Sequence, residues 1–303
     1  MQKQACVGDG GVAFSLLLSG TDMKKRVLVT GGQGFTGRYL VNQLLQAGDE
    51  VFVLKADIYD AEALLQEVRG ILPTHVVHLA GISFTPEGKD INVYKVHVIG
   101  SENLLKACRE LGSLVRKVIL VSSSHVYGDR SDGEPINEHV CPAPSTHYAI
   151  SKYGMECVAI KYAEILPILI VRPFNYTGCR QMGHFLVPKL VRHFRLREPE
   201  MELGNIGVAR DFSDVRWVAQ VYSALLDSKH EGMVNVCSGR AISIRYMLDY
   251  LSQKTGHTPK LRQRDELMRQ EGGVQVGDRS RLDNWVGIEP YRFEDTLDWM
   301  LSG

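Results

Sequence analysis

The sequence lacks an excess of charge of either sign, a long apolar run and any clustering of its cysteines. Thirty-five Lys and Arg residues balance thirty-five Asp and Glu residues, so no overall field recruits nucleic acid or an anionic membrane. No apolar run approaches the roughly 20 residues of a membrane-spanning helix. The six cysteines are scattered, without a Cys-x-x-Cys pair or a Cys/His cluster. We therefore expect a cytoplasmic protein in a reduced setting, with no metal, nucleic-acid or membrane partner.

The length and composition are ordinary for a globular protein. The 303 residues can form one large α/β unit or a main domain with a smaller lobe, and 44% of them are apolar. The apolar stretch 12–18 is interrupted and too short for the core of a signal peptide. We expect residues 1–22 to be an extension with no place in the fold, and a cleaved export signal is the alternative.

The first strong signal is a glycine-rich turn between a strand and a helix. Residues 26–30 (RVLVT) suit a buried parallel strand, GGQGFTG follows at once, and residues 38–47 have helical apolar spacing. Gly31 permits a tight turn, Gly34 lets the backbone approach a pyrophosphate, and Gly37 allows close packing of helix on strand. The free amide groups of the helix N-terminus suit the phosphates. The context predicts a dinucleotide site that also includes Phe35 and Thr36, although glycines alone could form an ordinary turn.

The second strand, residues 50–54, ends at Lys55 without an acidic residue at its tip. An Asp or Glu there binds the ribose diol of NAD, whereas a basic residue suits the 2′-phosphate of NADP. Lys55 therefore favours NADPH over NADH, unless it is simply solvated. Asp57 and Ile58 are expected at the adenine edge of the cofactor. The rival role for Asp57 is to cap the helix expected at 61–68.

The third strand, residues 76–81, ends in small residues where a cofactor can pass close to the backbone. We assign Leu79, Ala80 and Gly81 to cofactor binding on this basis. His78 lies inside the strand, and a hydrogen-bonded structural histidine is favoured there over a catalytic one. A long amphipathic helix is expected over residues 93–111.

The stretch THYAISK reads as the start of a helix that carries Tyr148 and Lys152 four residues apart. That spacing puts both side chains on one face, roughly 6 Å apart along the axis. An ammonium there is expected to lower the tyrosine's pKa from its ordinary value of about 10, which prepares it for proton exchange with a carbonyl or alcohol oxygen. By itself the pattern could also be a half-buried tyrosine beside a solvated lysine.

A serine cluster upstream supplies a second hydroxyl. Residues 117–121 form a buried strand that runs straight into Ser122, Ser123 and Ser124. Ligands of open α/β sheets bind beyond the carboxyl ends of the strands, so a serine there can hydrogen-bond the oxygen that Tyr148 serves. The alternative is that the three serines cap a turn.

Together these motifs resemble the extended short-chain dehydrogenase/reductase family, whose members act on nucleotide-linked sugars, and the resemblance runs from about Lys24 to the C-terminus. It implies a doubly wound parallel sheet with a smaller mixed α/β substrate lobe. Residues 23–170 would form the dinucleotide-binding domain and residues 171–303 the lobe, with a segment of about 214–240 returning to the main domain. The resemblance assigns Ser123, Tyr148 and Lys152 to catalysis, with Lys152 also binding the nicotinamide ribose of NADP or NAD.

The second half resembles the reductases of GDP-4-keto-6-deoxy-mannose and their close relatives. RPFNYTG at 172–178, RDFSDV at 210–215 and NVCSG at 235–239 carry this resemblance. It implies that Asn175 and Arg210 contact the sugar diphosphate, for which an arginine fork is suited. The alternative for Arg210 is an ion pair with Asp211 or Asp214.

Several residues depart from the family pattern. Arg180 replaces a glycine and brings an extra positive charge toward the expected phosphate path, and Arg269 stands in a blurred Arg-Pro pair near the nucleotide site. His97 replaces an asparagine. Ser124 and His125 are expected at the substrate, and His125 stands where related 4,6-dehydratases have a glutamate.

The resemblance implies a homodimeric enzyme that reduces the C4 keto group of a nucleotide-linked 4-keto-6-deoxy sugar with NAD(P)H. The specific expectation is conversion of GDP-4-keto-6-deoxy-D-mannose to GDP-D-rhamnose. A nucleotide-sugar 4-epimerase or 4,6-dehydratase of the same family is the enzymatic alternative. A non-catalytic dinucleotide-binding regulator is the alternative from another class.

Overall fold

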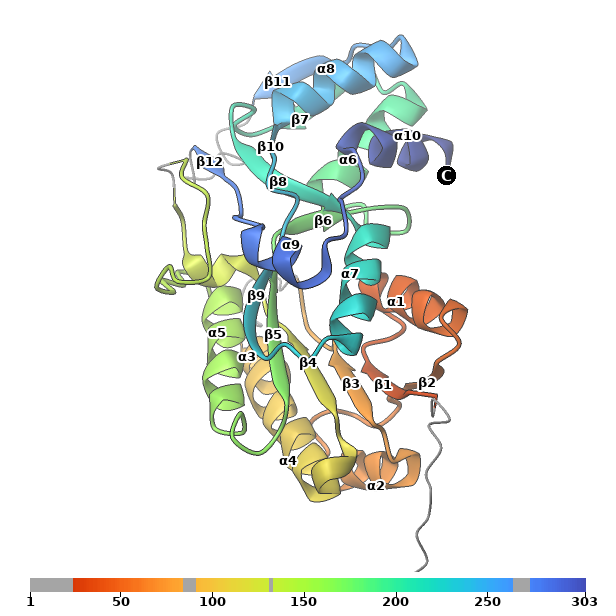
Figure 1. Cartoon of the computed structure of the whole chain (residues 1–303). Helices are drawn as coiled ribbons and strands as arrows, with labels where there is room; N and C mark the ends of the chain where they lie inside the picture. Colours follow the sequence, from red (N-terminus) through yellow and green to blue (C-terminus); the bar gives the residue numbers. More distant parts are fainter. Residues whose placement is uncertain (1–23, 84–90, 131–132, 264–272) are drawn as a thin grey trace, which may run out of the picture.

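The main body is a six-stranded parallel sheet between two layers of helices (Figure 1). The computed structural model describes residues 24–83, 91–130, 133–263 and 273–303, so the expected extension at 1–22 lies outside the described residues. The strand order is β2-β1-β3-β4-β5-β9, and every neighbouring pair is parallel. The strands are β1 (Arg26–Thr30), β2 (Glu50–Val53), β3 (His75–His78), β4 (Lys117–Val121), β5 (Ile168–Pro173) and β9 (Gly232–Val236).

The inner strands of the sheet are buried on both faces because helices cover both sides. In β1, Val27 and Val29 pack into one apolar cluster and Leu28 packs into the other. The first cluster is closed by α1 (Phe35–Gln46), α7 (Val215–Asp227) and α9 (Ser280–Val286). The second is closed by α2 (Ala61–Ile71), α4 (Ser101–Leu111) and α5 (His147–Ile160). The predicted doubly wound α/β fold is confirmed.

The smaller lobe lies over the end of the sheet at which β5 continues into β6 (Figure 1). Its apolar cluster joins α6 (Leu186–Leu196), α8 (Ile244–Thr255) and α10 (Phe293–Ser302) with β7 (Glu200–Leu203). β7 pairs in parallel with β11 (Lys260–Gln263). A four-stranded sheet leads from the main body into the lobe: β8 (Ala209–Asp214) pairs with β6 (Asn175–Thr177), β10 (Ala241–Ser243) and β12 (Val274–Gln275). The chain then returns through α7 and β9 to the main sheet.

The helix expected over 93–111 is continuous but not uniform. It begins as α3 (Ile91–Tyr94), widens into a π-helical turn at Lys95–Gly100 and continues as α4. A π-helical turn inserts an extra residue and so rotates the side chains that follow, and such turns are frequent at functional sites. Here the turn places His97 in the interior, where none of its surface is exposed. No described helix is long and apolar enough to cross a membrane.

Candidate active site

The glycine turn after β1 has the close contacts that a dinucleotide cradle requires. Gly31 has φ of +68°, and a Cβ there would lie 2.8 Å from the amide nitrogen of Ala80. A Cβ on Gly37 would lie 2.3 Å from the carbonyl oxygen of Gly31. Gly34 precedes α1, and its N–H donates to the Gly31 carbonyl at 3.0 Å. The residues therefore fit a dinucleotide, because the turn brings bare backbone and the N-terminus of α1 together.

The side chains that follow in the turn connect it to the smaller lobe. The Thr36 hydroxyl lies 2.8 Å from the hydroxyl of Tyr176 on β6, and the Phe35 ring stacks on the Tyr176 ring at 6.2 Å. The sequence did not single out Tyr176. The contact means that the first strand of the lobe is tied to the turn predicted to hold the cofactor.

A carboxylate from a neighbouring helix lies at the tip of β2, although the strand itself ends without an acidic residue. The Glu67 carboxylate reaches from α2 and accepts the backbone N–H groups of Lys55 at 2.9 Å and Ala56 at 2.7 Å. The Lys55 side chain is exposed. Sequence reasoning missed Glu67, since twelve residues and a turn separate it from the strand tip.

The rival role considered for Asp57 is wrong. The cap of α2 is Asp60, whose carboxylate accepts the N–H of Ala63 at 3.0 Å, whereas Asp57 accepts the N–H of Tyr59 two residues on. Ile58 is buried beneath the helix that carries Asn103, and the Asn103 amide donates to the Ile58 carbonyl at 3.1 Å. The segment at the expected adenine edge is therefore held from α4.

The end of β3 is fixed by a buried chain of hydrogen bonds through His78. The Ala80 N–H donates to Thr30 Oγ1 at 3.1 Å, and Thr30 Oγ1 lies 2.6 Å from His78 Nδ1. On the other side, His78 Nε2 lies 2.8 Å from Ser101 Oγ, which donates to the carbonyl of His97. Burial, with a smaller effect of Lys152, lowers the pKa of His78 to about 3. This geometry is that of a neutral structural histidine, hydrogen-bonded through both ring nitrogens.

The end of β4 and the start of α5 bring the three proposed catalytic residues together. Ser123 precedes the short 3-10 turn Ser124–Tyr127 and is buried, as is Ser124. Tyr148 lies in the first turn of α5, which the Thr146 hydroxyl caps by accepting the N–H of Ala149. Lys152 is buried one turn later and donates through Nζ to the Val121 carbonyl at 2.8 Å. This hydrogen bond joins the end of β4 to α5, the helix that carries Tyr148.

The prediction that Lys152 lowers the pKa of Tyr148 is wrong. Burial raises the pKa of Tyr148 to about 12, and the hydrogen-bonding side chain of Ser123 offsets only part of that rise. Burial also lowers the pKa of Lys152 to about 8, against which the nearby Glu156 acts. The reason is that both groups lose water, which disfavours the charged form of each. Both shifts are toward the uncharged form, the phenol of Tyr148 and the amine of Lys152.

His125 makes two contacts with the Ser123 hydroxyl oxygen. Its Nδ1 lies 3.0 Å from Ser123 Oγ, and its backbone N–H donates to the same oxygen at 3.3 Å. With Nδ1 protonated, His125 donates to Ser123 and leaves the serine O–H pointing elsewhere. The Tyr148 ring meets His125 at 5.8 Å and His97 at 5.7 Å, both edge to face.

A buried ion pair joins the elements that carry Ser123, Tyr148 and Lys152. Glu156 on α5 is 1% exposed and Arg172 on β5 is 2% exposed. Arg172 donates to the carboxylate through Nε at 2.9 Å and Nη2 at 2.6 Å, and the Ser122 hydroxyl donates to it at 2.5 Å. Sequence reasoning did not identify Glu156. The carboxylate connects β4, α5 and β5, the three elements around the proposed catalytic residues.

The predicted substrate residues lie mainly on the lobe side of the sheet. Asn175 begins β6 and donates to the Asp211 carbonyl at 3.3 Å. Arg210 on β8 is half-buried and donates to the carbonyls of Ala209 and Gly273. Arg180 is exposed with φ of +68°, in keeping with a position where the family pattern has glycine. Arg269 lies outside the described residues.

The two aspartates considered as ion-pair partners of Arg210 have other partners. Asp211 accepts the N–H groups of Ser238 at 2.8 Å and Gly239 at 2.9 Å. Asp214 accepts hydrogen bonds from Nε and Nη2 of Arg216. These bonds fix β8 against the loop after β9 and against α7.

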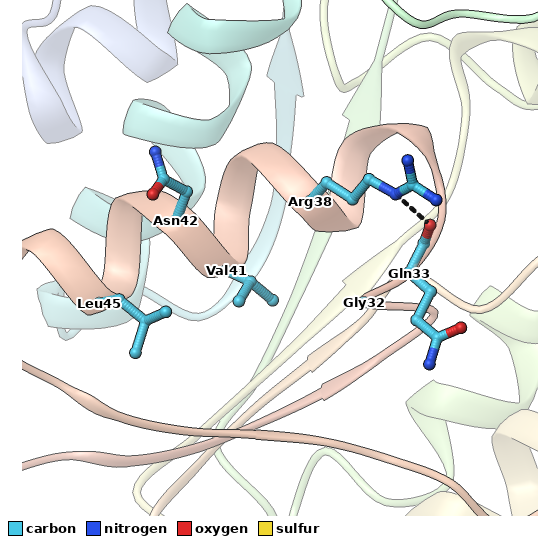
Figure 2. Close-up of a pocket in the computed structure, with 6 residues that line it drawn as sticks. All are labelled: Gly32, Gln33, Arg38, Val41, Asn42 and Leu45. Atoms are coloured by element: carbon cyan, nitrogen blue, oxygen red, sulfur yellow. Dashed lines mark hydrogen bonds between the residues drawn. The ribbon is translucent and has the colours of Figure 1, made fainter.

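A hollow of about 380 Å³ lies along α1, next to the glycine turn (Figure 2). Gly32, Gln33 and Arg38 form its rim, and Val41, Asn42 and Leu45 continue its wall along the helix. Arg38 Nε donates to the Gln33 carbonyl at 2.8 Å, which holds the guanidinium beside the turn (Figure 2). The hollow adjoins the turn predicted to hold the cofactor, and its lining contains none of the three proposed catalytic residues.

The fold and this arrangement define a dinucleotide-binding α/β protein with a Ser/Tyr/Lys cluster. The chain belongs to the NAD dependent epimerase/dehydratase family, whose sequence model matches residues 27–237. It is 33% identical to the GDP-6-deoxy-D-talose 4-dehydrogenase of Aggregatibacter actinomycetemcomitans and 31% identical to the GDP-6-deoxy-D-mannose reductase of Pseudomonas aeruginosa. Each alignment covers 88% of this chain and 93% of the relative.

Solved structures agree with this placement. The structure of RMD from Pseudomonas aeruginosa complexed with NADPH is similar with a TM-score of 0.84 and 29% identity, covering 92% of this chain and 97% of that one. The UDP-glucose 4-epimerase of Thermus thermophilus in complex with NAD is similar with a TM-score of 0.78 and 26% identity, covering 91% of this chain and 97% of that one. The predicted family is confirmed.

Proposed function

We propose that this protein reduces the C4 keto group of a nucleotide-linked 4-keto-6-deoxy sugar with NAD(P)H. The observation that carries the proposal is the arrangement of Ser123 at the end of β4 with Tyr148 and Lys152 one turn apart on α5, where Lys152 Nζ donates to the Val121 carbonyl at 2.8 Å. A reduction needs an acid at the developing alkoxide, and general acid catalysis contributes about 10²–10⁴-fold. When bound, the reduced nicotinamide supplies the hydride to the sugar carbon.

The chain's own residues supply the proton and the positioning. Tyr148 donates its phenolic proton to the C4 oxygen, and Ser123 hydrogen-bonds the same oxygen. The Lys152 ammonium, anchored on the Val121 carbonyl, provides positive charge behind the tyrosine and binds the nicotinamide ribose. Asn175 and Arg210 hold the sugar diphosphate, and Arg180, Ser124 and His125 face the substrate.

The proposed substrate is GDP-4-keto-6-deoxy-D-mannose, and the proposed product is GDP-D-rhamnose. The support is that two relatives at 33% and 31% identity carry names of GDP-6-deoxy-hexose enzymes. The relative named for GDP-6-deoxy-D-talose favours a second candidate product, the C4 epimer, which comes from hydride addition to the other face of the same carbonyl. A nucleotide-sugar 4-epimerase remains the rival activity.

The test is turnover of this 4-keto sugar with NADPH, with the product identified by NMR. Net oxidation of NADPH in step with loss of the keto sugar is the expected result. A 4-epimerase would instead interconvert the two 4-hydroxy products, the C4 epimers, without net change of the cofactor. Tyr148→Phe should keep the fold and cofactor binding but lose roughly 10²–10⁴-fold in turnover, equivalent to about 3–5 kcal/mol. Ser123→Ala should cost less, and Lys152→Ala should also weaken cofactor binding. Turnover of Tyr148→Phe within a few-fold of wild type would contradict the mechanism.

We propose NADPH as the preferred cofactor. The support is two cations near the proposed cofactor site, the exposed Lys55 at the tip of β2 and Arg38 beside the glycine turn, either of which suits a 2′-phosphate. The Glu67 carboxylate opposes this preference, but the backbone N–H groups of Lys55 and Ala56 already neutralise part of its charge.

We further propose a homodimer that forms across α5 and the helix beside it. Ile99 on the π-helical turn is 51% exposed, and Ile160 on α5 is 65% exposed. The neighbouring Lys161 pairs with Glu102 across the two helices at 3.5 Å, so the exposed isoleucines belong to one packed helix pair. A second copy of the same face would bury them.

A further inference from the structure

His97 lies at the junction of two segments that the proposed reaction must keep in register. One is the loop after β3, which begins at Leu79 and whose first three residues are predicted to bind the cofactor. The other is the first turn of α5, which carries Tyr148. The imidazole is 0% exposed and lies on the π-helical turn between these segments.

The hydrogen bonds around the ring assign its proton to one nitrogen. The Ile82 N–H donates to His97 Nε2 at 3.0 Å, so Nε2 is the unprotonated nitrogen. The Ser151 hydroxyl donates its single proton to the Tyr148 carbonyl at 2.8 Å. The Ser151 oxygen is therefore the acceptor in the 2.8 Å contact with His97 Nδ1. Two independent partners thus require the same tautomer, neutral with the proton on Nδ1.

The imidazole of His97 also leaves little room for a side chain at Gly81 in the loop after β3. A Cβ on Gly81 would lie 3.0 Å from His97 Nε2 and 3.3 Å from Lys152 Nζ. The edge of the imidazole meets the Tyr148 ring at 5.7 Å and 81°. Burial, together with Lys152 and His78, lowers the pKa of His97 to about 2, so the ring remains neutral wherever the protein is folded.

We propose that His97 is a positioning residue that fastens the cofactor-side loop to the helix turn that carries the proton donor. Its Nε2 holds the loop through Ile82, and its Nδ1–H holds the backbone of Tyr148 through Ser151. The two halves act on different steps: the Nε2 half serves cofactor binding, and the Nδ1 half serves proton donation. This inference rests on the proposed reduction.

Two substitutions separate the two halves. In His97→Gln, the amide oxygen can take the place of Nε2 and keep the Ile82 bond, while the Nδ1 donor is lost. In His97→Asn, the amide nitrogen can take the place of Nδ1 and keep the Ser151 bond, while the Nε2 acceptor is lost. We expect His97→Gln to lower kcat roughly 3- to 10-fold with the cofactor KM unchanged, and His97→Asn to raise the cofactor KM by a similar factor with kcat less affected, the range of one hydrogen bond.

Two further variants complete the design. Ser151→Ala removes the intermediary of the Nδ1 half and should reproduce the kcat loss of His97→Gln. His75→Gln is the matched control, because His75 is also a buried histidine of low pKa but lies at the opposite end of β3. It should change neither kcat nor KM. Equal effects of His97→Gln and His97→Asn on kcat and KM, or no effect of either, would overturn the proposal. If neither His97 variant folds, the kcat of Ser151→Ala tests the proposal, and an unchanged kcat would overturn it.

A readout independent of activity separates this inference from the proposed function. In protein with ¹⁵N-labelled histidine, the NMR shifts of His97 should report a protonated Nδ1 and a bare Nε2, unchanged from pH 6 to 9. An Nε2–H tautomer or a titrating ring would refute the tautomer assignment even in an active enzyme. Conversely, a wild-type protein that shows this tautomer but reduces no 4-keto sugar refutes only the proposed function, and NADPH dissociation constants of the two variants then test the loop half.

Discussion

Replacing Glu156 with glutamine should destabilise the fold and disturb the proposed active site together. The Glu156 carboxylate accepts three hydrogen bonds from two residues in separate parts of the chain, two from Arg172 (Nε and Nη2) and one from the Ser122 hydroxyl. Glutamine is nearly isosteric and keeps one acceptor oxygen, but it removes the negative charge and turns an NH₂ group toward Arg172. The guanidinium, 2% exposed and resting on the Tyr127 ring at 4.7 Å, would then be a buried charge without its counterion.

The magnitude follows from the burial of both partners. Breaking a buried ion pair by removal of one partner costs about 3–5 kcal/mol, because the remaining charge stays desolvated. In a protein of this size, each kcal/mol lowers Tm by roughly 2–4 °C, so Tm should fall on the order of 10 °C. Turnover should fall as well, because Ser122 precedes Ser123 and Glu156 lies on the helix of Tyr148.

Urea unfolding of Glu156→Gln, Arg172→Met and the double variant measures the effect. The double variant should be less destabilised than the sum of the singles, since neither charge is left alone in it. Glu164→Gln is the matched control at an exposed carboxylate just beyond α5, and it should stay within about 0.5 kcal/mol of wild type. A loss below about 1 kcal/mol for Glu156→Gln, or full additivity in the double variant, would refute the reasoning.

Three further predictions concern the cofactor, the assembly and pH. Lys55→Ala should weaken NADPH binding and leave NADH binding unchanged, and equal affinities for both cofactors in wild type would count against the preference. Ile99→Glu with Ile160→Glu should give monomers by light scattering, whereas a monomeric wild type would exclude the dimer. Reduction should slow as pH rises through about 8, where the buried Lys152 loses its charge; a flat kcat profile from pH 7 to 9.5 would contradict this. The same pKa shift affects the free energy of unfolding in the opposite direction. Below pH 8 the folded protein bears the full cost of burying the ammonium. Between about pH 8 and 10.5 the stability rises, because only the unfolded chain binds that proton there.

The parts of the fold that local sequence encodes were predictable. The glycine turn is recognisable because a strand, three spaced glycines and a helix follow one another within about twenty residues. The start of α5 is marked by the Thr146 cap and the spacing of Tyr148 and Lys152. Each of these signals lies within one or two turns of chain, and the alternation of Val27, Leu28 and Val29 between two cores follows from the parallel sheet alone.

The parts that depend on contacts between distant segments were not predictable. Glu67 completes the tip of β2 from the next helix, and Glu156 joins Arg172 and Ser122 across 16 and 34 positions. The π-helical turn that buries His97 leaves no mark in apolar spacing. Asp57 and Asp60 are both plausible caps in sequence, and only the helix start selects Asp60.

The pKa of Tyr148 was mispredicted for the same reason, and its corrected direction bears on the reaction. A tyrosine with its pKa lowered toward neutrality could accept a proton as easily as it donates one, as an epimerase requires in its two half-reactions. Burial instead raises the pKa of Tyr148 to about 12, which favours the protonated phenol. A protonated phenol is the form that donates a proton in a carbonyl reduction, whereas an epimerase uses the phenol and the phenolate in turn. The pH dependence of turnover in the reduction and in the oxidation direction therefore tests the proposed reductase against an epimerase.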